Sequence, residues 1–337
     1  MDKYNSIITE LQKRSINVLR NTAMAKFTTI GVGGPADILV VAGNSRELIS
    51  VIELALDSSL PFKLIGRGSN LIVSDNGYRG MIIVNRSKGW EIINKPARTA
   101  DFAQTGSRFT GEDKNSLYNL KENKTSVLVK VASGNRIPIL IKELFKEGIS
   151  GLEWFTGIPG TIGGAVYMNI HGADTFLGDL VVRARLFSGK EIKEVENSYF
   201  RFKYDWCILH ETHEHILDVD LRLNEGMVDE ARKQSHDWAR YKANQPQKSA
   251  GCIFQNLTGQ EMDQLKIPTP SVGYVIDKLL HLKGTRQGNA MISVNHAAFI
   301  ENLGGASATD VINLIELISQ RAKKELGINL KKEVEII

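Results

Sequence analysis

Residues 66–70 have the composition of a loop that binds phosphate groups. The segment combines two glycines with three hydrogen-bonding side chains, in the order Gly66, Arg67, Gly68, Ser69 and Asn70. Successive backbone N–H groups in such a turn can surround an anion, and glycine lets that anion approach the backbone closely. Plain turns that follow a strand favour the same residue types. Composition alone therefore leaves a phosphate-binding loop and an ordinary turn as equal alternatives.

A second glycine-rich segment, residues 157–165, is too apolar for an ordinary surface loop. Besides Ile162 it contains Gly157, Ile158, Pro159, Gly160, Thr161, Gly163, Gly164 and Ala165. Each glycine costs about 0.5–1 kcal/mol relative to alanine in a regular element, so the repeated glycines need a reason. Backbone packed against a flat ligand, such as an isoalloxazine ring, is one explanation, and tight packing within the protein is the other.

A third glycine-rich segment, residues 31–36, matches the loose dinucleotide-binding pattern G-x-G-x-x-A. That fingerprint should follow a strand and open a helix. Here Pro35 and Asp37 lead instead into the strand-like residues 38–41. The sequence therefore argues against a Rossmann fold.

Three histidines lie close together at positions 210, 213 and 215, beside Glu211 and Glu214. Such a cluster could bind Zn²⁺, but structural zinc sites usually include cysteine as well. The segment also resembles a connector between two strands. We therefore expect no metal site.

The elements that position the glycine-rich segments follow from the spacing of apolar residues. Residues 38–41 predict a buried strand, Asn44 and Ser45 offer an N-cap for a helix with apolar positions 48, 51, 52, 55 and 56, and residues 62–65 predict a second strand. The first glycine-rich loop thus follows the second strand of a βαβ unit. Further strands are expected at 127–131, 181–187, 216–223 and 330–337, and further helices at 137–146, 228–243, 272–280 and from a capping box at Ser307 to Gly327. This alternation predicts a mixed α/β architecture, with residues 94–126 as an exposed insertion.

Length and charge limit the class of protein. A chain of 337 residues suits two or three domains. The net charge of +4 suits anionic small molecules and falls far short of a nucleic-acid-binding stripe. The first 20 residues lack the apolar core of a signal peptide, and no run of about 18 apolar residues predicts a membrane span. With only Cys207 and Cys252, a reducing compartment is the simpler expectation. We expect a soluble cytoplasmic protein.

Five segments, in order along nearly the whole chain, together resemble the UDP-N-acetylenolpyruvoylglucosamine reductase family. They are Thr-Thr-Ile-Gly-Val-Gly-Gly-Pro-Ala-Asp at 28–37, Gly-Arg-Gly-Ser-Asn-Leu-Ile-Val-Ser-Asp at 66–75, the glycine-rich stretch from Gly-Leu-Glu-Trp to Tyr-Met-Asn at 151–169, Ser-Ala-Gly-Cys-Ile-Phe-Gln-Asn at 249–256 and Glu-Val-Glu-Ile-Ile at 333–337. Each segment is modest alone, but the ordered set is highly specific.

The resemblance implies an α+β protein with an FAD-binding fold of the vanillyl-alcohol-oxidase type. It implies FAD-binding subdomains at 1–88 and 89–226, a substrate domain at 227–327 and a last strand, 328–337, that returns to the first subdomain. NADPH would reduce FAD, which would pass hydride to the enolpyruvyl group of a UDP-sugar and yield UDP-N-acetylmuramate for peptidoglycan synthesis. The short connection from Tyr204 to residue 216 resembles the family branch without an extra tyrosine-bearing loop. We expect a monomer.

The resemblance also suggests roles for individual residues. Cys252 takes the position of the Ser or Cys that protonates the substrate, and a thiol with a pKa of about 8.5 is mostly protonated at neutral pH. A buried apolar cysteine would be the common alternative. Glu333 takes the position of the acid that helps polarise the substrate carboxylate. Tyr204, Lys242, Asn256 and His296 would bind substrate, although the family lysine position is Asn244 here. The glycine-rich segments, including Gly31, Gly33 and Gly34, would bind the cofactor.

Two segments depart from the family pattern. In residues 202–207 the family reads Phe-x-Tyr-Arg-x-Ser, but this chain has Asp205 and Cys207 where the pattern has arginine and serine. The arginine should meet the substrate carboxylate and stabilise the developing enolate, and losing such a donor costs about 3–4 kcal/mol in other enzymes. Either Arg201 or Lys203 substitutes, or the substrate differs, or activity is reduced. After Asn169 the family reads Ala-Gly-Ala-Tyr-Gly, whereas this chain reads Ile-His-Gly-Ala-Asp.

Asp205 keeps a second reading open, in which the chain is a flavin- or UDP-sugar-binding paralogue that has lost or altered the reductase step. Cys252, Asn256 and Glu333 together favour the reductase, because a protein freed from catalysis need not keep all three. A flavin oxidase of the same fold with another substrate is a third reading. We expect the reductase, with Cys252, Glu333 and Asp205 at the catalytic site.

Overall fold

The computed structural model describes residues 3–94, 125–173 and 175–337. Most of the predicted insertion at 94–126 therefore lies outside the described residues. The chain forms two compact units: unit 1 comprises Met1–Arg86 and Lys242–Ile337, and unit 2 comprises Ser87–Tyr241. Within the described residues, no helix is both long and apolar enough to cross a membrane.

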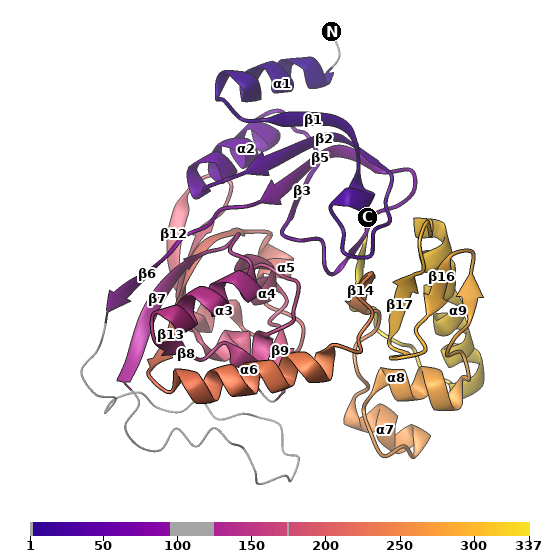
Figure 1. Cartoon of the computed structure of the whole chain (residues 1–337). Helices are drawn as coiled ribbons and strands as arrows, with labels where there is room; N and C mark the ends of the chain where they lie inside the picture. Colours follow the sequence, from indigo (N-terminus) through magenta and orange to yellow (C-terminus); the bar gives the residue numbers. More distant parts are fainter. Residues whose placement is uncertain (1–2, 95–124, 174) are drawn as a thin grey trace. The chain divides into compact units, whose positions relative to one another are not determined.

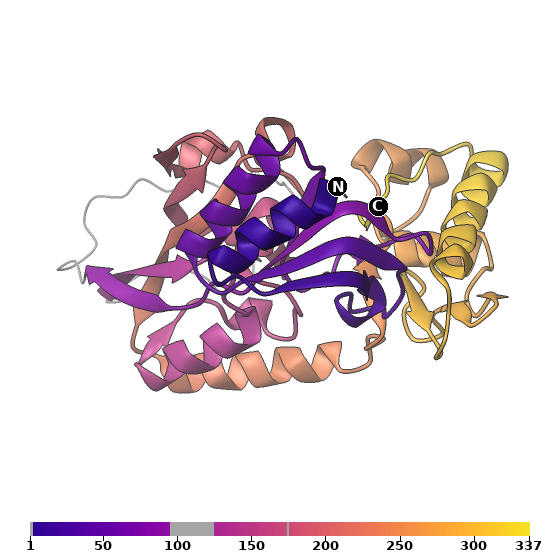
Figure 2. The same ribbon diagram turned by 90° about the horizontal axis from the view of Figure 1, so that it is seen from above.

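The N-terminal part of unit 1 contains the predicted βαβ unit. Its elements are α1 (Lys3–Lys13), β1 (Val18–Ala23), η1 (Met24–Lys26), β2 (Pro35–Ala42), α2 (Ser45–Asp57), β3 (Phe62–Ile65), β4 (Leu71–Ile72) and β5 (Tyr78–Asn85). Asn44 caps α2, because its side chain accepts the N–H of Glu47 at 2.9 Å. Helices α1 and α2 lie on one face of the sheet (Figure 1, Figure 2).

Strand β5 lies between the two strands of the βαβ unit, in the sheet order β1-β2-β5-β3. Strands β2 and β3 both run parallel to β5, so the crossover helix α2 joins strands that are not neighbours. The loop at 66–70 leaves the end of β3 and leads into β4. Strand β4 pairs in parallel with β18 (Glu335–Ile336), which comes from the far end of the sequence. The C-terminal segment therefore fixes the strand on which this loop ends.

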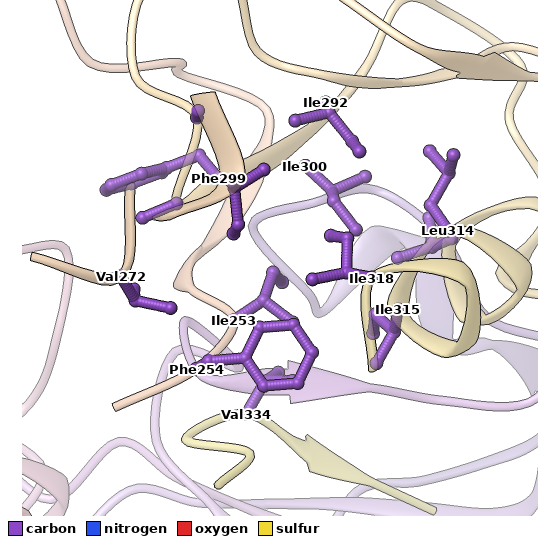
Figure 3. Close-up of a cluster of buried hydrophobic side chains, with 14 of the residues drawn as sticks. Ile253, Phe254, Val272, Ile292, Phe299, Ile300, Leu314, Ile315, Ile318 and Val334 are labelled. Atoms are coloured by element: carbon purple, nitrogen blue, oxygen red, sulfur yellow. The ribbon is translucent and has the colours of Figure 1, made fainter. Parts of the chain in front are cut away.

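The C-terminal part of unit 1 is built around a small antiparallel sheet, in the order β14-β17-β16-β15. Its elements are β14 (Ser249–Cys252), α7 (Gly259–Leu265), α8 (Val272–Tyr274), the π-helical turn η5 (Val275–Leu279), β15 (Arg286–Gln287), β16 (Ala290–Ile292), β17 (Phe299–Asn302), α9 (Ala308–Arg321) and the π-helical turn η6 (Ala322–Leu326). Figure 3 shows Ile253 and Phe254 in the core between this sheet, α9 and Val334. These buried neighbours fix the position of Cys252.

Helix α9 begins at the predicted capping box, with an additional cap from a distant loop. The Ser307 side chain accepts the N–H of Asp310, and the Asp310 carboxylate accepts the N–H of Ser307. In addition, Asp75 accepts hydrogen bonds from the N–H groups of Ala308 and Thr309, both at 2.8 Å, and from the Thr309 hydroxyl at 2.7 Å. Sequence patterns did not indicate the cap from Asp75.

We expect Asp75→Asn to lower the free energy of unfolding at pH 7 by about 1 kcal/mol, because the amide keeps only one of the two acceptor oxygens and loses the negative charge at the helix N-terminus. Burial alone would raise the pKa of Asp75, but the hydrogen bonds from Thr309 and Ala308 outweigh it and lower the pKa. The stabilisation is therefore complete above about pH 4 and is lost as the pH falls through the lowered folded-state value. Urea unfolding at pH 7 and pH 3 measures both effects. Asp263→Asn, at an exposed position of α7, is the control; an equal loss in both variants would contradict the cap.

Unit 2 consists of an antiparallel sheet with helices against it. Its elements are β6 (Trp90–Asn94), β7 (Thr125–Ala132), α3 (Ile137–Lys146), β8 (Ile149–Ser150), η2 (Glu153–Phe155), α4 (Ile162–Tyr167), β9 (His171–Gly172), β10 (Thr175–Phe176), η3 (Leu177–Asp179), β11 (Val181–Phe187), β12 (Ile192–Glu196), η4 (Asn197–Phe200), α5 (Leu209–Thr212), β13 (His215–Glu225) and α6 (Val228–Lys242). The sheet order is β12-β11-β13-β7-β6. Helix α4 packs against β7 and β13 (Figure 1).

Helix α6 packs on unit 2 through its polar and aromatic residues. The Thr156 and Ser235 hydroxyls are 2.6 Å apart, and the rings of Trp154 and Trp238 meet edge to face with centroids 5.4 Å apart. Most of this helix therefore groups with unit 2, although the family resemblance implies a third domain that starts at residue 227. The division into three domains stays a prediction.

Candidate active site

The loop at 66–70 adopts a conformation that only glycine accommodates at position 68. Gly68 has φ of +60°, and a Cβ atom there would lie 2.3 Å from the carbonyl oxygen of Phe27. Its own carbonyl oxygen accepts the N–H of Thr29 at 3.1 Å. The loop is thus held close to residues 27–29, and a larger residue at position 68 would displace it from them.

The same loop fits the pyrophosphate of a nucleotide cofactor. Within the described part of the chain, the N–H groups of Gly68 and Ser69 donate no hydrogen bond. A left-handed glycine next to a turn directs successive N–H groups toward one point, which is a common way to bind an anion. The side chain of Arg67 lies in the same loop and adds positive charge. The structure therefore supplies the donors that a phosphate group needs.

Cys252 and Glu333 lie on neighbouring segments close to this loop. The N–H of Glu333 bonds to the carbonyl oxygen of Ile253, the residue after Cys252, at 2.9 Å. The Asn70 amide donates to the carbonyl oxygen of Glu333 at 3.0 Å. The backbone segments that carry the loop, Cys252 and Glu333 are thus neighbours within unit 1.

The other residues predicted on unit 1 have different surroundings. Burial lowers the pKa of the Lys242 ammonium, and electrostatic attraction to Cys252 offsets part of that shift, so these two side chains are neighbours. The Asn256 side chain accepts the N–H of Val272 at 3.2 Å, where α8 begins. Burial is also the main cause of a lowered pKa at His296. Its Nδ1 accepts the N–H of Ala298 at 3.4 Å, so the neutral ring carries its proton on Nε2.

The glycines at 31–34 have structural reasons for their identity. A Cβ atom on Gly34 would lie 2.0 Å from the carbonyl oxygen of Asp75, and one on Gly33 would lie 2.9 Å from Val73. The N–H of Gly34 bonds to Ser74, and that of Gly31 bonds to Thr28. Their role toward a cofactor stays a prediction.

In unit 2, the apolar glycine-rich segment forms a tight turn and the short helix α4. Thr161 caps this helix, and a Cβ atom on Gly163 would lie 2.8 Å from the Ser133 side chain. The N–H groups of Ile162 and Gly163 bond to the carbonyl oxygens of Asn135 and Ser133. Close packing therefore explains Gly163, whereas Gly157 and Pro159 are exposed and leave the start of the segment open to a ligand.

Tyr204 and Asp205 form the tip of a tight turn that is closed by a bridge between Lys203 and Trp206. The Asn169 amide donates to the carbonyl oxygen of Lys203 at 2.9 Å, so the turn is attached to the end of the glycine-rich segment. Asp205 has φ of +49° and its side chain is 5% exposed. Its Oδ1 lies 3.9 Å from Nδ1 of His171. Position 171 belongs to one of the two departures from the family pattern, and the local sequence pattern does not reveal its contact with Asp205.

The histidine-rich connector shows aromatic packing and ion pairing. The His210 ring stacks on Tyr167, with centroids 3.9 Å apart. Glu214 accepts the Tyr199 hydroxyl at 2.6 Å and pairs with Lys193. Among the residues that the structure describes, no group of three or more His, Cys, Asp or Glu side chains could hold a metal ion.

Comparisons with known proteins agree along the chain. Residues 243–337 match the family model for the C-terminal domain of UDP-N-acetylenolpyruvoylglucosamine reductase, and residues 115–191 match an FAD binding domain. The UDP-N-acetylenolpyruvoylglucosamine reductases of Bacillus velezensis and Bacillus subtilis are each 33% identical to this chain, over 98% of it and 98% of their own length. The crystal structure of UDP-N-acetylenolpyruvylglucosamine reductase from Thermus caldophilus is similar with a TM-score of 0.70 and 30% identity, and the match covers 95% of this chain and 99% of that one.

Proposed function

The chain belongs to the UDP-N-acetylenolpyruvoylglucosamine reductase family, and we propose that it reduces UDP-N-acetylglucosamine enolpyruvate to UDP-N-acetylmuramate in peptidoglycan precursor synthesis. The predicted α+β fold, the FAD-binding fold and the cofactors FAD and NADPH are confirmed by the matches to this family. The observation that carries the assignment is the likeness to reductases over nearly the whole chain. The backbone hydrogen bonds among the segments that carry Cys252, Glu333 and the loop at 66–70 support a common site in unit 1.

When bound, FAD supplies the redox chemistry by taking a hydride from NADPH and passing it to the enolpyruvyl double bond. The residues around the loop at 66–70 fit its pyrophosphate, because Gly68 and Ser69 offer N–H groups and Arg67 a positive charge. We assign the remaining cofactor contacts to the segment that begins at Gly157. These assignments rest on composition, conformation and the family resemblance.

Cys252 is the proposed acid that protonates the substrate carbon next to the one that receives hydride. Loss of the thiol proton leaves a thiolate, and the neighbouring Lys242 ammonium stabilises that negative charge. A carboxylate at Glu333 orients the reacting group on the same side of unit 1. Because Ile253 and Phe254 are fixed in the core (Figure 3), the backbone that carries the thiol is held in place.

The other proposed substrate contacts come from Tyr204, Asn256 and His296. A neutral His296 with its proton on Nε2 can donate a hydrogen bond to the UDP-sugar. The side-chain oxygen of Asn256 accepts the N–H of Val272 at the start of α8, and this bond orients the amide N–H₂ donor of the same side chain. Tyr204 offers a phenol beside Asp205 on unit 2.

We also propose that the protein works in the cytoplasm as a monomer. Cys207 and Cys252 do not form a disulfide, which agrees with a reducing compartment. The small net charge of +4 gives no reason to expect a nucleic-acid partner. Sedimentation of the purified protein tests the monomer, and a mass well above 37.4 kDa would contradict it.

An anaerobic two-step experiment tests the activity. Bound flavin is reduced with NADPH, UDP-N-acetylglucosamine enolpyruvate is added, and flavin absorbance follows reoxidation. We expect rapid reoxidation with formation of UDP-N-acetylmuramate, and no reoxidation with UDP-N-acetylglucosamine, which lacks the double bond. A flavin that is reduced normally but stays reduced with the enolpyruvyl substrate would contradict the reductase.

A further inference from the structure

Asp205 is a buried carboxylate in a turn that is attached to Asn169, which is itself hydrogen-bonded to Gly178. The Asn169 amide holds the carbonyl oxygen of Lys203, and the Asn169 side-chain oxygen accepts the N–H of Gly178, at 2.9 Å each. The Asp205 side chain is only 5% exposed. A buried carboxylate is costly unless positive charge or hydrogen-bond donors compensate it. The basic groups near this turn therefore decide what the carboxylate does.

Three basic side chains are candidates, and His171 lies within ion-pair distance of Asp205, with Nδ1 3.9 Å from Oδ1. Lys203 is engaged elsewhere, because its Nζ lies 4.6 Å from the centre of the Trp206 ring. Arg201 is exposed and lines a separate cavity with Ser198, Tyr199, Ile208 and Thr212. Neither of the two substitutes suggested by the sequence thus occupies the place of the family arginine.

The His171 side chain contacts two aromatic rings as well as the buried carboxylate. Its ring centroid is 5.1 Å from that of Tyr204 and 5.6 Å from that of Phe176. Its side chain is 36% exposed, so a ligand can reach it from solvent. An imidazole beside a carboxylate holds a positive charge more readily. With Nδ1 toward Asp205, the ring can donate a charged hydrogen bond from Nε2.

We propose that His171, oriented by Asp205, is the cationic group that binds the carboxylate of the enolpyruvyl substrate. The proposal rests on the proposed function and deepens it. Both positions depart from the family pattern, which has glycine at 171 and arginine at 205, and the two departures contact each other. In this chain position 171 supplies the cationic side chain that the family has at position 205. Asp205 acts as a positioning residue through His171.

Ligand binding without turnover tests this proposal. Calorimetry on the oxidised, FAD-loaded full chain compares UDP-N-acetylglucosamine enolpyruvate with UDP-N-acetylglucosamine, which lacks the carboxylate. We expect wild type to prefer the enolpyruvyl ligand, and His171→Gln to reduce that preference about 10-fold, because a charged hydrogen bond is lost. Affinity for UDP-N-acetylglucosamine should not change. Lys203→Gln is the matched control, since Lys203 stacks on Trp206, and it should keep the full preference.

Two experiments test the role of Asp205: one removes its charge, and the other supplies the cation from position 205 in place of position 171. Asp205→Asn should lower the preference without changing the affinity for UDP-N-acetylglucosamine, because His171 loses the charge that orients it. His171→Gly should lose the preference, and adding Asp205→Arg should recover at least about 3-fold of it, because an arginine there supplies the cation. A merely structural pair would weaken both ligands together.

The proposal is overturned if wild type shows no preference for the enolpyruvyl ligand, or if His171→Gln keeps the wild-type preference. Binding of UDP-N-acetylglucosamine reports whether a variant is folded. Asp205→Asn is a second, independent test of the preference for the enolpyruvyl ligand. Failure of the proposed function would look different: wild-type reduced flavin would not be reoxidised by the enolpyruvyl substrate. Normal reoxidation in wild type with an unchanged preference in His171→Gln rejects only the role of His171.

Discussion

Cys252→Ala is expected to leave the reduction of bound flavin by NADPH unchanged and to slow its reoxidation by the enolpyruvyl substrate by at least about 100-fold. A positioned general acid contributes on that order to a proton-transfer step. The first half-reaction needs no proton from this thiol, so the two rates should separate. Stopped-flow absorbance of the flavin measures both in one sample. Reoxidation at the wild-type rate in the alanine variant would reject Cys252 as the acid.

Two further variants make this result specific. Cys252→Ser keeps an acidic O–H at the same position and should retain part of the reoxidation rate. Cys207→Ser is the control for loss of a thiol: burial raises the pKa of Cys207 to about 11, its Sγ donates to the carbonyl oxygen of Tyr167 at 3.3 Å, and serine can make the same bond. Both half-reactions should stay normal in that control.

Gly68→Ala should yield a folded protein that loses FAD on purification. Alanine is strained at φ of +60°, and its Cβ atom would lie 2.3 Å from the carbonyl oxygen of Phe27. The loop must shift, and the N–H groups that surround the pyrophosphate shift with it. We expect flavin affinity to fall at least 10-fold, about 1.4 kcal/mol. The ratio of flavin to protein absorbance after gel filtration measures the loss.

Gly148→Ala is the matched control for this glycine. It follows α3 with φ of +76°, and a Cβ atom there would meet nothing within 4 Å. This control carries the same backbone strain without the collision, so it should lower stability by about 1 kcal/mol and retain flavin. If both variants keep FAD equally well, the loop at 66–70 does not hold the pyrophosphate.

Elements with strong local signals could be predicted closely from the sequence. Strand β3, helix α3 and strand β11 have the predicted bounds. Helix α3 has a regular apolar stripe, with buried residues at Ile137, Leu140, Ile141 and Leu144, and the capping box at Ser307 is present at α9. In these segments the spacing of apolar residues and the end signals agree, so local sequence is sufficient.

Features that depend on distant partners could not be predicted. The strand expected at 330–337 is reduced to Glu335–Ile336, because only these residues pair with β4. The last turn of the helix at 272–279 is π-helical, a change that apolar spacing does not reveal. The helix expected to end at Gly327 likewise changes to a π-helical turn at Ala322–Leu326.

The candidate site also combines features that local sequence predicts with features that depend on distant residues. Glycine-rich segments were visible in the sequence, but whether Gly33 and Gly34 serve a ligand or the packing of two loops depends on Val73 and Asp75, far along the chain. The pairing of His171 with Asp205 requires a left-handed turn residue and the anchor at Asn169. Neither is encoded by spacing, so the sequence could show only that both positions are unusual.

The return of β18 to β4 has a consequence for how the protein is made. Asn70, at the end of the glycine-rich loop, bonds to Glu333, which lies 263 positions later in the chain. A ribosome adds about 5–20 residues per second, so more than about 10 seconds separate these two partners during synthesis. All of unit 2 emerges in that interval, and the loop for the nucleotide is completed last. Nascent chains stalled before Glu333 should therefore retain no flavin, and cofactor loading should follow release of the finished polypeptide.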